Sequence, residues 1–332
     1  MKIYSTERTK MEINGLKLKN GLMLAPMAGV TDRAFRTLCA EFGAEYCVTE
    51  MISAKAVCFG DKKTAALARP EEGEQVAIQI FGSEPYYMAK AASELLKYAP
   101  IAIDINMGCP VPKCVKSGEG SALMKNPELC GRIVAEVKAA VNVPVGVKMR
   151  TGFDDAHKNA LEVAKRVEEA GAAYVCLHGR TRTQMYSGTA ERDTLKAVKE
   201  ALTIPVIGNG DIKCGEDALS MFAETGCDAV AVGRGAMGKP WLFAELAAAI
   251  EGRAYTPPTA EEKCAAVVKH IKSTVANKGA QVAIPELRKH LAWYSKGLYG
   301  SAALRNRVTS VCTEKEALAV AEAMFFPPTA EE

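Results

Sequence analysis

Apolar and polar positions alternate in blocks along roughly the first 230 residues. Short apolar runs rich in β-branched residues recur, as in buried parallel strands, and most are separated by stretches of helical periodicity. Several predicted helices carry end signals, such as Asn126 before Pro127 at one start and Gly171 at one end. The predicted strands are 21–28, 44–51, 76–82, 101–106, 143–150, 172–178, 204–208 and 228–233, and the predicted helices are 31–42, 85–98, 127–141, 156–170, 190–201 and 215–225.

This alternation matches a TIM barrel, an α/β fold of eight strand–helix units, in both count and size. A doubly wound open sheet is the alternative, but no G-x-G-x-x-G motif follows the first strand. The dipeptides Asn14-Gly15 and Asn20-Gly21 are typical of hairpin turns. We therefore expect the first twenty residues to form a small β cover on the barrel.

The pattern changes after residue 252. Pro257 and Pro258 lie in a predicted linker, and 260–324 is helical in pattern. Pro285 is predicted to start one helix, and 297–300 to break another. The sequence thus predicts a TIM barrel over 1–252 and a small C-terminal all-helical domain over 253–332.

Composition narrows the class of protein. The chain is 48% hydrophobic but only 6% aromatic, which suits a large parallel α/β core. No apolar run reaches the ~18 residues of a membrane span, and the polar N-terminal stretch predicts a cytoplasmic protein without membrane contact. The eleven cysteines are scattered and odd in number, which predicts reduced thiols. Because Cys109 and Cys114 have no histidine nearby, no metal site is predicted.

Charge is distributed unevenly. The whole chain carries +3, but 263–315 holds ten Lys and Arg against two acids, which makes that segment +8 and leaves −5 elsewhere. Such asymmetry fits a polyanionic partner, and it equally fits an ordinary solvated helical face.

Polar residues cluster where the predicted strands end, which is where TIM barrels build their active sites. Gly-rich loops follow the seventh and eighth strands, as in phosphate sites where backbone N–H groups and an arginine approach the anion; simple tight turns are the alternative. The strand-end candidates are Pro26, Met27, Ala28, Gln79, Cys109, Lys148, His178, Asn209, Gly210, Asp211, Gly233 and Arg234.

A phosphate at these loops would place a ring system over the barrel mouth. Lys148 would then stabilise the anionic reduced form of a flavin, and Gln79 would offer a donor and an acceptor to the ring. Each role has an alternative. Lys148 would instead pair with Asp104 or Asp211, His178 would satisfy a strand-end hydrogen bond, and Cys109 would be a small buried hydrophobe.

Seven motifs together resemble the tRNA-dihydrouridine synthases: LAPMAGVTDRAFR (24–36), QIFGSEP (79–85), DINMGCPVPKCVKSGEGSALM (104–124), VKMRTGF (147–153), LHGRTRTQMYSG (177–188), GNGDI (208–212) and GRGAMGKPW (233–241). The tail, with Leu287, Arg288, Lys289, His290, Trp293 and Tyr294, resembles the B-type bacterial branch. This resemblance implies an FMN-dependent barrel with a helical RNA-binding domain, which uses NADPH to reduce uridine in tRNA to dihydrouridine. It implies no obligatory protein partner.

The same resemblance implies residue roles. FMN would be held at the strand-end candidates other than Cys109, with Asp211 acting through its backbone, and Cys109 would be the proton donor. The chemistry agrees, because hydride addition at C6 of uracil leaves an anion whose C5 needs a proton from a protonated acid. Lys113 and Lys116 are near in sequence and are expected to lower the pKa of Cys109.

A uridine inside folded RNA must leave its stack to reach a flavin. The candidate phosphate contacts are Lys113, Lys116, Arg180, Arg182, Arg288, Lys289, Arg305 and Arg307. Trp293 and Tyr294 would stack on bases or fill a buried helix face. The loop 113–121 would close over the substrate, and Cys114 is expected in a loop or at the surface. Two alternatives remain: a dihydroorotate dehydrogenase-like flavoenzyme acting on a free pyrimidine, and a non-catalytic RNA-binding protein.

Overall fold

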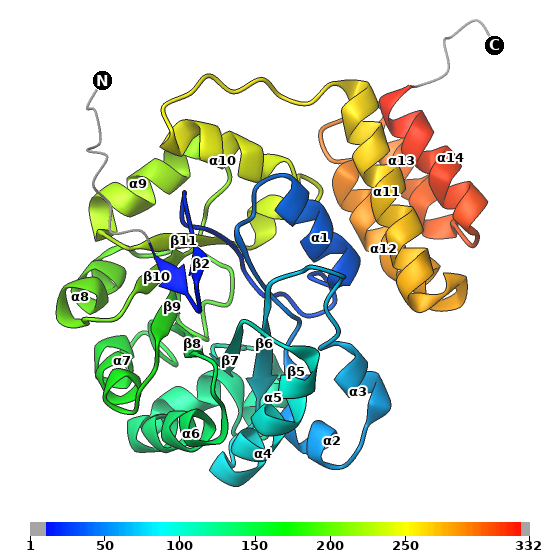
Figure 1. Cartoon of the computed structure of the whole chain (residues 1–332). Helices are drawn as coiled ribbons and strands as arrows, with labels where there is room; N and C mark the ends of the chain where they lie inside the picture. Colours follow the sequence, from blue (N-terminus) through cyan, green and yellow to red (C-terminus); the bar gives the residue numbers. More distant parts are fainter. Residues whose placement is uncertain (1–10, 327–332) are drawn as a thin grey trace, which may run out of the picture.

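The computed structural model describes residues 11–326 of the 332-residue chain, and its centre is a closed parallel barrel (Figure 1). The strands pair in the order β4-β3-β11-β10-β9-β8-β7-β6, and pairing of β4 with β6 closes the ring. The predicted TIM barrel is thereby confirmed. Its strands are β3 (Leu22–Leu24), β4 (Tyr46–Val48), β6 (Val76–Phe81), β7 (Ala102–Met107), β8 (Val145–Arg150), β9 (Tyr174–His178), β10 (Val206–Asn209) and β11 (Ala229–Val232), with β5 (Ile52–Ser53) added beside β6.

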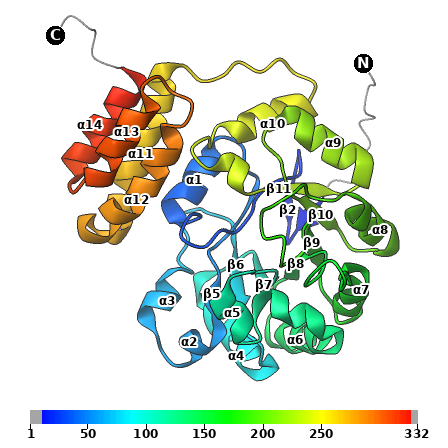
Figure 2. The same ribbon diagram turned by 180° about the vertical axis from the view of Figure 1, so that it is seen from behind.

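Helices surround the barrel, as the two opposite views show (Figures 1 and 2). At the start of the helix Pro127–Ala140, the Asn126 side chain accepts a hydrogen bond from the Leu129 N–H at 3.0 Å and Pro127 occupies the first turn, as predicted. Its apolar face then packs inward at helical spacing. The outer helices are α1 (Arg33–Glu41), α4 (Pro85–Leu95), α6 (Pro127–Ala140), α7 (Ala160–Glu169), α8 (Asp193–Ala201), α9 (Gly215–Thr225) and α10 (Leu242–Ile250).

Three short helices lie where the sequence analysis assigns none. They are α2 (Ala54–Cys58) and α3 (Lys62–Ala66) before β6, and α5 (Pro112–Lys116) after β7. Asp61 caps α3 by accepting hydrogen bonds from two backbone N–H groups. Five residues make little more than one turn, so no hydrophobic period can reveal such helices in the sequence.

A hairpin covers the N-terminal end of the barrel. It consists of β1 (Glu12–Ile13) and β2 (Leu16–Lys17), joined at Asn14 and Gly15, whose φ angles are both positive. The predicted turn is thus confirmed, while the rest of the predicted cover, residues 1–10, lies outside the described residues. Met11 and Ile13 pack with residues that fill the barrel.

Inside the barrel, two tyrosines take the space that one glycine leaves. A Cβ at Gly146 would lie 1.9 Å from the Cζ atom of Tyr174, so only glycine fits on β8 at this height. The Tyr174 hydroxyl lies 2.8 Å from that of Tyr46 on β4. This pair lies near the N-terminal ends of the strands, where a series of hydrogen-bonded polar side chains begins that extends toward their C-terminal ends.

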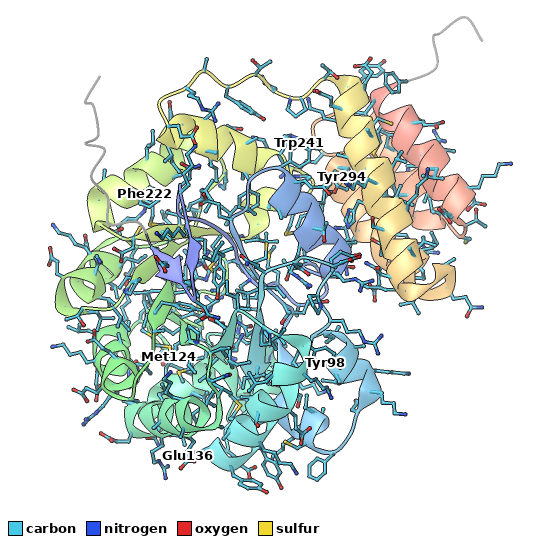
Figure 3. All side chains as sticks on the ribbon, viewed as in Figure 1. Tyr98, Met124, Glu136, Phe222, Trp241 and Tyr294 are labelled. Atoms are coloured by element: carbon cyan, nitrogen blue, oxygen red, sulfur yellow. The ribbon has the colours of Figure 1, made fainter. Side chains whose placement is uncertain are left out.

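Four more helices form a bundle beside α1 (Figures 1 and 2). They are α11 (Ala260–Lys278), α12 (Ala280–Tyr294), α13 (Ser301–Ser310) and α14 (Glu314–Phe325). The bundle has its own apolar cluster, to which the barrel contributes Leu38 and Trp241. Trp241 and Tyr294 lie at the contact between the two parts, with ring centroids 6.3 Å apart (Figure 3). The boundary at residue 252 stays a prediction.

Pro285 does not start a helix, so that prediction is wrong. The helix α12 begins five residues earlier, at Ala280, and contains the proline. Because proline has no backbone N–H, the carbonyl of Gln281, four residues earlier, lacks its usual helical partner. Both residues are exposed, so water can bind this carbonyl. None of the described helices combines the length and apolar character needed to cross a membrane.

Candidate active site

The C-terminal ends of the strands bring most of the predicted site residues to one rim. Strand register sets Lys148 on β8 beside Asn106 on β7, and His178 on β9 beside Asn209 on β10. Because all the barrel strands run parallel, side chains at these ends face the same mouth. Residues separated by up to about two hundred positions in the sequence therefore converge.

A chain of hydrogen bonds crosses the barrel toward this mouth. The Tyr174 hydroxyl donates to the Asp104 carboxylate at 3.0 Å, and the Gln79 amide nitrogen donates to its other oxygen at 2.6 Å. The Asn106 amide nitrogen donates to the Gln79 oxygen at 2.8 Å. Burial raises the pKa of Asp104 to about 6, against the effect of these donors, so it is mostly ionised at neutral pH.

Ionised Asp104 only accepts hydrogen bonds, and this sets the direction of the whole chain. Gln79 must present its nitrogen to Asp104 and its oxygen to Asn106. Asn106 must then present its nitrogen to Gln79, which leaves its oxygen for the next turn of the backbone. The predicted acceptor of Gln79 is therefore engaged within the protein, and one N–H of its amide is left beyond the bond to Asp104.

The backbone at Cys109 is held from three sides. The Asn106 side-chain oxygen accepts from the N–H groups of Gly108 and Cys109 at 3.1 and 2.9 Å. Arg150 donates to the Gly108 carbonyl at 2.8 Å, and the Ser121 hydroxyl donates to the Cys109 carbonyl at 2.8 Å. The backbone that carries the Cys109 side chain is thereby fixed by groups on β7, β8 and the segment that follows β7.

A hydrogen bond from Cys114 lowers the pKa of the Cys109 thiol, burial opposes this, and Arg150 adds to the lowering. The expectation that Lys113 and Lys116 lower this pKa is wrong, because both lysines are exposed and Cys114 has the largest effect. Cys114 lies on α5 in the predicted loop, but its side chain is 6% exposed rather than at the surface. The thiol that acts on Cys109 is thus a buried neighbour.

Cations outnumber acids around the mouth. The pKa of His178 is lowered to about 2 by burial first and then by Lys148, Arg150, Arg180 and Arg234, so its imidazole is neutral. Lys148 donates to the Asn209 side-chain oxygen at 3.0 Å. Within residues 11–326, no ion pair joins Lys148 to an acid, which removes its predicted alternative role. Such an excess of positive charge favours an anionic ligand.

Asp211 takes up part of this charge. Its carboxylate accepts from Arg180 at 2.7 Å, from the Ala190 N–H at 2.8 Å and from Arg234 at 3.4 Å. The residue adopts a φ of 50°, in the left-handed region that Asp tolerates in turns. With its carboxylate engaged in this way, its backbone is the part left for a ligand.

The two predicted phosphate loops lie against each other. A Cβ at Gly235 would lie 2.1 Å from the Ile212 carbonyl oxygen, which shows how closely the two loops pack. A Cβ at Gly210 would lie 2.5 Å from the Ala190 Cβ in the segment after β9. Gly233 follows β11 directly, and Arg234 begins a short 3-10 turn with its side chain half exposed over the Tyr186 ring. This gives two adjacent backbone turns with an arginine at their edge.

The loop after β3 forms the other side of the mouth. Pro26 and Met27 are half-buried and Ala28 is exposed. A Cβ at Gly29 would lie 3.3 Å from the Lys289 ammonium nitrogen, so α12 of the helical bundle reaches this loop. The mouth is therefore bordered by both parts of the chain.

Some sequence predictions placed side chains wrongly, and others missed them. Arg180 is 2% exposed and donates to the Ser187 and Gly188 carbonyls and to Asp211, so it is no surface contact for RNA. Tyr294 is buried, with its hydroxyl 3.0 Å from His270, which confirms the helix-face alternative for that residue. Asn106 and Arg150 were not among the candidates, and their only signal was their place at strand ends.

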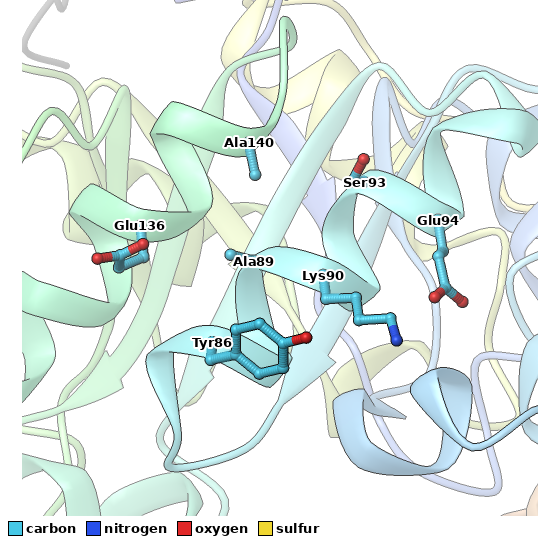
Figure 4. Close-up of a pocket in the computed structure, with 7 residues that line it drawn as sticks. All are labelled: Tyr86, Ala89, Lys90, Ser93, Glu94, Glu136 and Ala140. Atoms are coloured by element: carbon cyan, nitrogen blue, oxygen red, sulfur yellow. The ribbon is translucent and has the colours of Figure 1, made fainter.

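A shallow pocket lies on the outer surface of the barrel between α4 and α6 (Figure 4). Tyr86, Lys90 and Glu136 are among its lining residues, and every lining residue belongs to one of these two helices. None of them is a strand-end residue, so this pocket is separate from the candidate active site.

Comparisons with known proteins agree with one another. The model of the dihydrouridine synthase (Dus) family matches residues 23–327. "tRNA-dihydrouridine synthase B" of Pasteurella multocida is 40% identical, over 95% of this chain and 96% of that protein. The Shewanella oneidensis protein of the same name is 42% identical, over 86% and 89%. Among solved structures, histamine dehydrogenase from Rhizobium sp. 4-9 shares the fold, with a TM-score of 0.57 and 13% identity over 80% of this chain and 50% of that one.

Proposed function

Because the chain belongs to the dihydrouridine synthase family, we propose that it reduces the C5=C6 bond of specific uridines in tRNA to 5,6-dihydrouridine, with FMN as cofactor and NADPH as reductant. The observation that carries this proposal is the fixed turn at Cys109 beside a cation-rich mouth. A neutral-acid donor and an anion site are the two elements that such a reduction needs.

The residues present fit FMN. Its phosphate would meet the backbone of Gly210, Asp211 and Gly233 together with Arg234, and its ring would meet Lys148, Gln79, His178, Asn209 and the backbone of Pro26, Met27 and Ala28. The fit rests on the excess of cations and on a buried donor, the Nη1 atom of Arg180, which has no partner among the described residues. When bound, FMN would supply the hydride to C6.

Cys109 would hold the proton that C5 receives. Its thiol must be protonated to act as an acid, and its lowered pKa makes that proton easier to transfer. Neutral His178 adds no charge at the mouth, and Lys148 would stabilise negative charge on the ring. Asn106 and Arg150 would hold the turn so that the acid stays in place during the reaction.

A tRNA substrate accounts for the helical bundle beside the mouth. The segment 263–315 carries +8, and Lys289 reaches the loop after β3. Phosphates bound there would hold the RNA while the target base enters the barrel. Since the proposed substrate is tRNA, we propose that the enzyme acts in the cytoplasm.

The test is position-by-position mass spectrometry of tRNA nucleosides from a strain that lacks this protein. We expect dihydrouridine to be lost at defined positions and restored by the wild type but not by Cys109→Ala. Cys312→Ala, which removes an exposed thiol on the helical bundle, is the matched control and should restore it fully. Unchanged dihydrouridine in a strain with no second synthase would contradict the RNA substrate, and reduction of free pyrimidines by the purified protein would then favour the small-molecule alternative.

A further inference from the structure

Cys109 and Cys114 meet inside the loop after β7. Both residues are buried, 9% and 6% exposed, and the Cys114 thiol is the largest influence that lowers the pKa of Cys109. A Cβ at Gly120 would lie 2.9 Å from the Cys109 Cβ and 2.9 Å from the Cys114 sulfur. The two cysteines therefore flank one point, and the bare glycine with its φ of +59° leaves them room to touch.

Cys109 differs from the other buried thiols in the direction in which its pKa is shifted. Its pKa is lowered, whereas burial raises the pKa of Cys47, Cys130 and Cys176 to about 12. The thiolate is the form that attacks peroxides, so an oxidant that enters the mouth would select Cys109. A sensor cysteine of this kind often has a second thiol beside it, and Cys114 lies next to Cys109 across Gly120.

We propose that Cys109 and Cys114 form an oxidation site, which hydrogen peroxide converts to a reversible disulfide. The Cys109 thiolate attacks one peroxide oxygen, so that an S–O bond forms, the O–O bond breaks and hydroxide leaves. The sulfur of Cys114 then attacks that of Cys109. An S–S bond forms, the S–O bond breaks, and the Cys114 proton leaves with the hydroxide as water. Peroxide is reduced by two electrons, which the two thiols supply.

The consequence for activity rests on the proposed function. A Cys109 sulfur bound to Cys114 has no proton to give, so reduction of uridine would stop until a dithiol reopened the bond. Cys114 would also protect its neighbour, because disulfide formation competes with further oxidation of the sulfenic acid to sulfinic acid, which thiols do not reverse.

The test uses the full chain with FMN bound, treated with hydrogen peroxide in steps from equimolar to excess. Remaining thiols are alkylated, and peptides are analysed by mass spectrometry. We expect a Cys109–Cys114 linkage with the loss of two hydrogens, removed by dithiothreitol. In Cys114→Ser we expect Cys109 to pass to the sulfinic acid instead. Cys130→Ser, which removes a buried thiol on α6, is the matched control and should still form the linkage.

Alkylation of both thiols after excess peroxide would overturn the proposal, as would the same reversible product in Cys114→Ser. The mass readout is independent of turnover, so this failure differs from that of the proposed function. If the linkage forms while dihydrouridine synthesis continues unchanged, the oxidation site stands and the proton-donor role of Cys109 fails.

Discussion

At the scale of single residues, burial and near neighbours together set the pKa of each group at the mouth. Burial lowers the pKa of Lys148, and nearby Asp104 partly offsets this. His178 lies among four cations and stays neutral. Cys109 is shifted the opposite way from other buried thiols because Cys114 donates to it. Neighbours, more than residue type, therefore set the chemistry of the site.

Lys148→Met tests the charge at the ring site. The variant keeps the length of the side chain but removes the ammonium group that donates to Asn209. We expect reduction of the bound flavin by NADPH to slow by about 10²- to 10³-fold, the typical cost of one electrostatic donor at a reaction centre. Stopped-flow absorbance of the flavin measures this step. Lys165→Met on the exposed face of α7 should react at the wild-type rate, and equal rates for both variants would exclude the role of Lys148.

At the scale of elements, β7 and the turn after it work as one unit. The strand carries Asp104 and Asn106 inward, and the turn after it carries Cys109. Hydrogen bonds link Tyr174 in the barrel core to Asn106 through Asp104 and Gln79, and Asn106 in turn holds the turn. The core therefore acts as a support for the proposed acid.

Asn106→Ala removes two hydrogen bonds to this turn and one to Gln79. We expect a loss of about 10²-fold or more in turnover, because a displaced acid transfers its proton poorly, with flavin content nearly unchanged. Rates of dihydrouridine formation and the flavin-to-protein absorbance ratio separate the two effects. Asn142→Ala, at an exposed position before β8, is the control. Wild-type turnover in Asn106→Ala would show that the turn keeps its position without the Asn106 side chain.

At the scale of the whole molecule, a buried cluster joins the barrel to the bundle. Phe35 of α1 contacts the rings of His270 and His290, whose centroids are 4.8 Å apart. Asp32 forms an ion pair with Lys278 at 2.6 Å. Each histidine has one ring nitrogen without a partner among the described residues. The contact thus contains two buried imidazoles, and protonation of either would place a positive charge where burial disfavours it.

Acid should therefore weaken this contact. Burial lowers the pKa of His270 to about 4 and that of His290 well below its usual value; Asp32 opposes this and Lys278 adds to it. Between pH ~6.5 and ~4 the unfolded chain binds more protons, so stability falls as pH falls, by roughly 1.4 kcal/mol per pH unit for each histidine. Thermal unfolding followed across this pH range measures the slope.

The histidines offer a matched pair of variants for that measurement. His290→Phe should flatten the fall in Tm with acid, since it removes one of the two groups. His157→Gln changes an exposed histidine on the barrel and should leave the slope unchanged. The same acid sensitivity in His290→Phe and the wild type would assign the effect to other groups.

Lys289→Glu tests the RNA surface between the two parts. Reversing this charge at the mouth should weaken tRNA binding and reduce the dependence of log Kd on log salt by about one unit, since roughly one counterion is released per phosphate contact. Filter binding over a salt series measures both. Lys138→Glu on α6, on the far side of the barrel from the bundle (Figure 1), is the control; identical slopes in both variants would place the RNA elsewhere.

The sequence by itself determined the strands, the capped helices and the rim of polar residues. Apolar runs, caps such as Asn126 and turns such as Asn14-Gly15 are local features, whose physics is complete within a few residues. The order of strands follows from their number and parallel alternation. These features sufficed to predict the barrel and the gathering of polar residues at one end of its strands.

Only the tertiary structure decided what each polar side chain contacts. Arg180 proved to be a buried partner of Asp211, Cys114 a buried neighbour of Cys109, and Asn106 the support of the turn at Cys109. The helices α2, α3 and α5 and the internal Pro285 likewise gave no periodic signal. The physical reason is that hydrogen bonds, burial and pKa shifts depend on neighbours brought from distant strands, and their distances do not exist until the barrel closes.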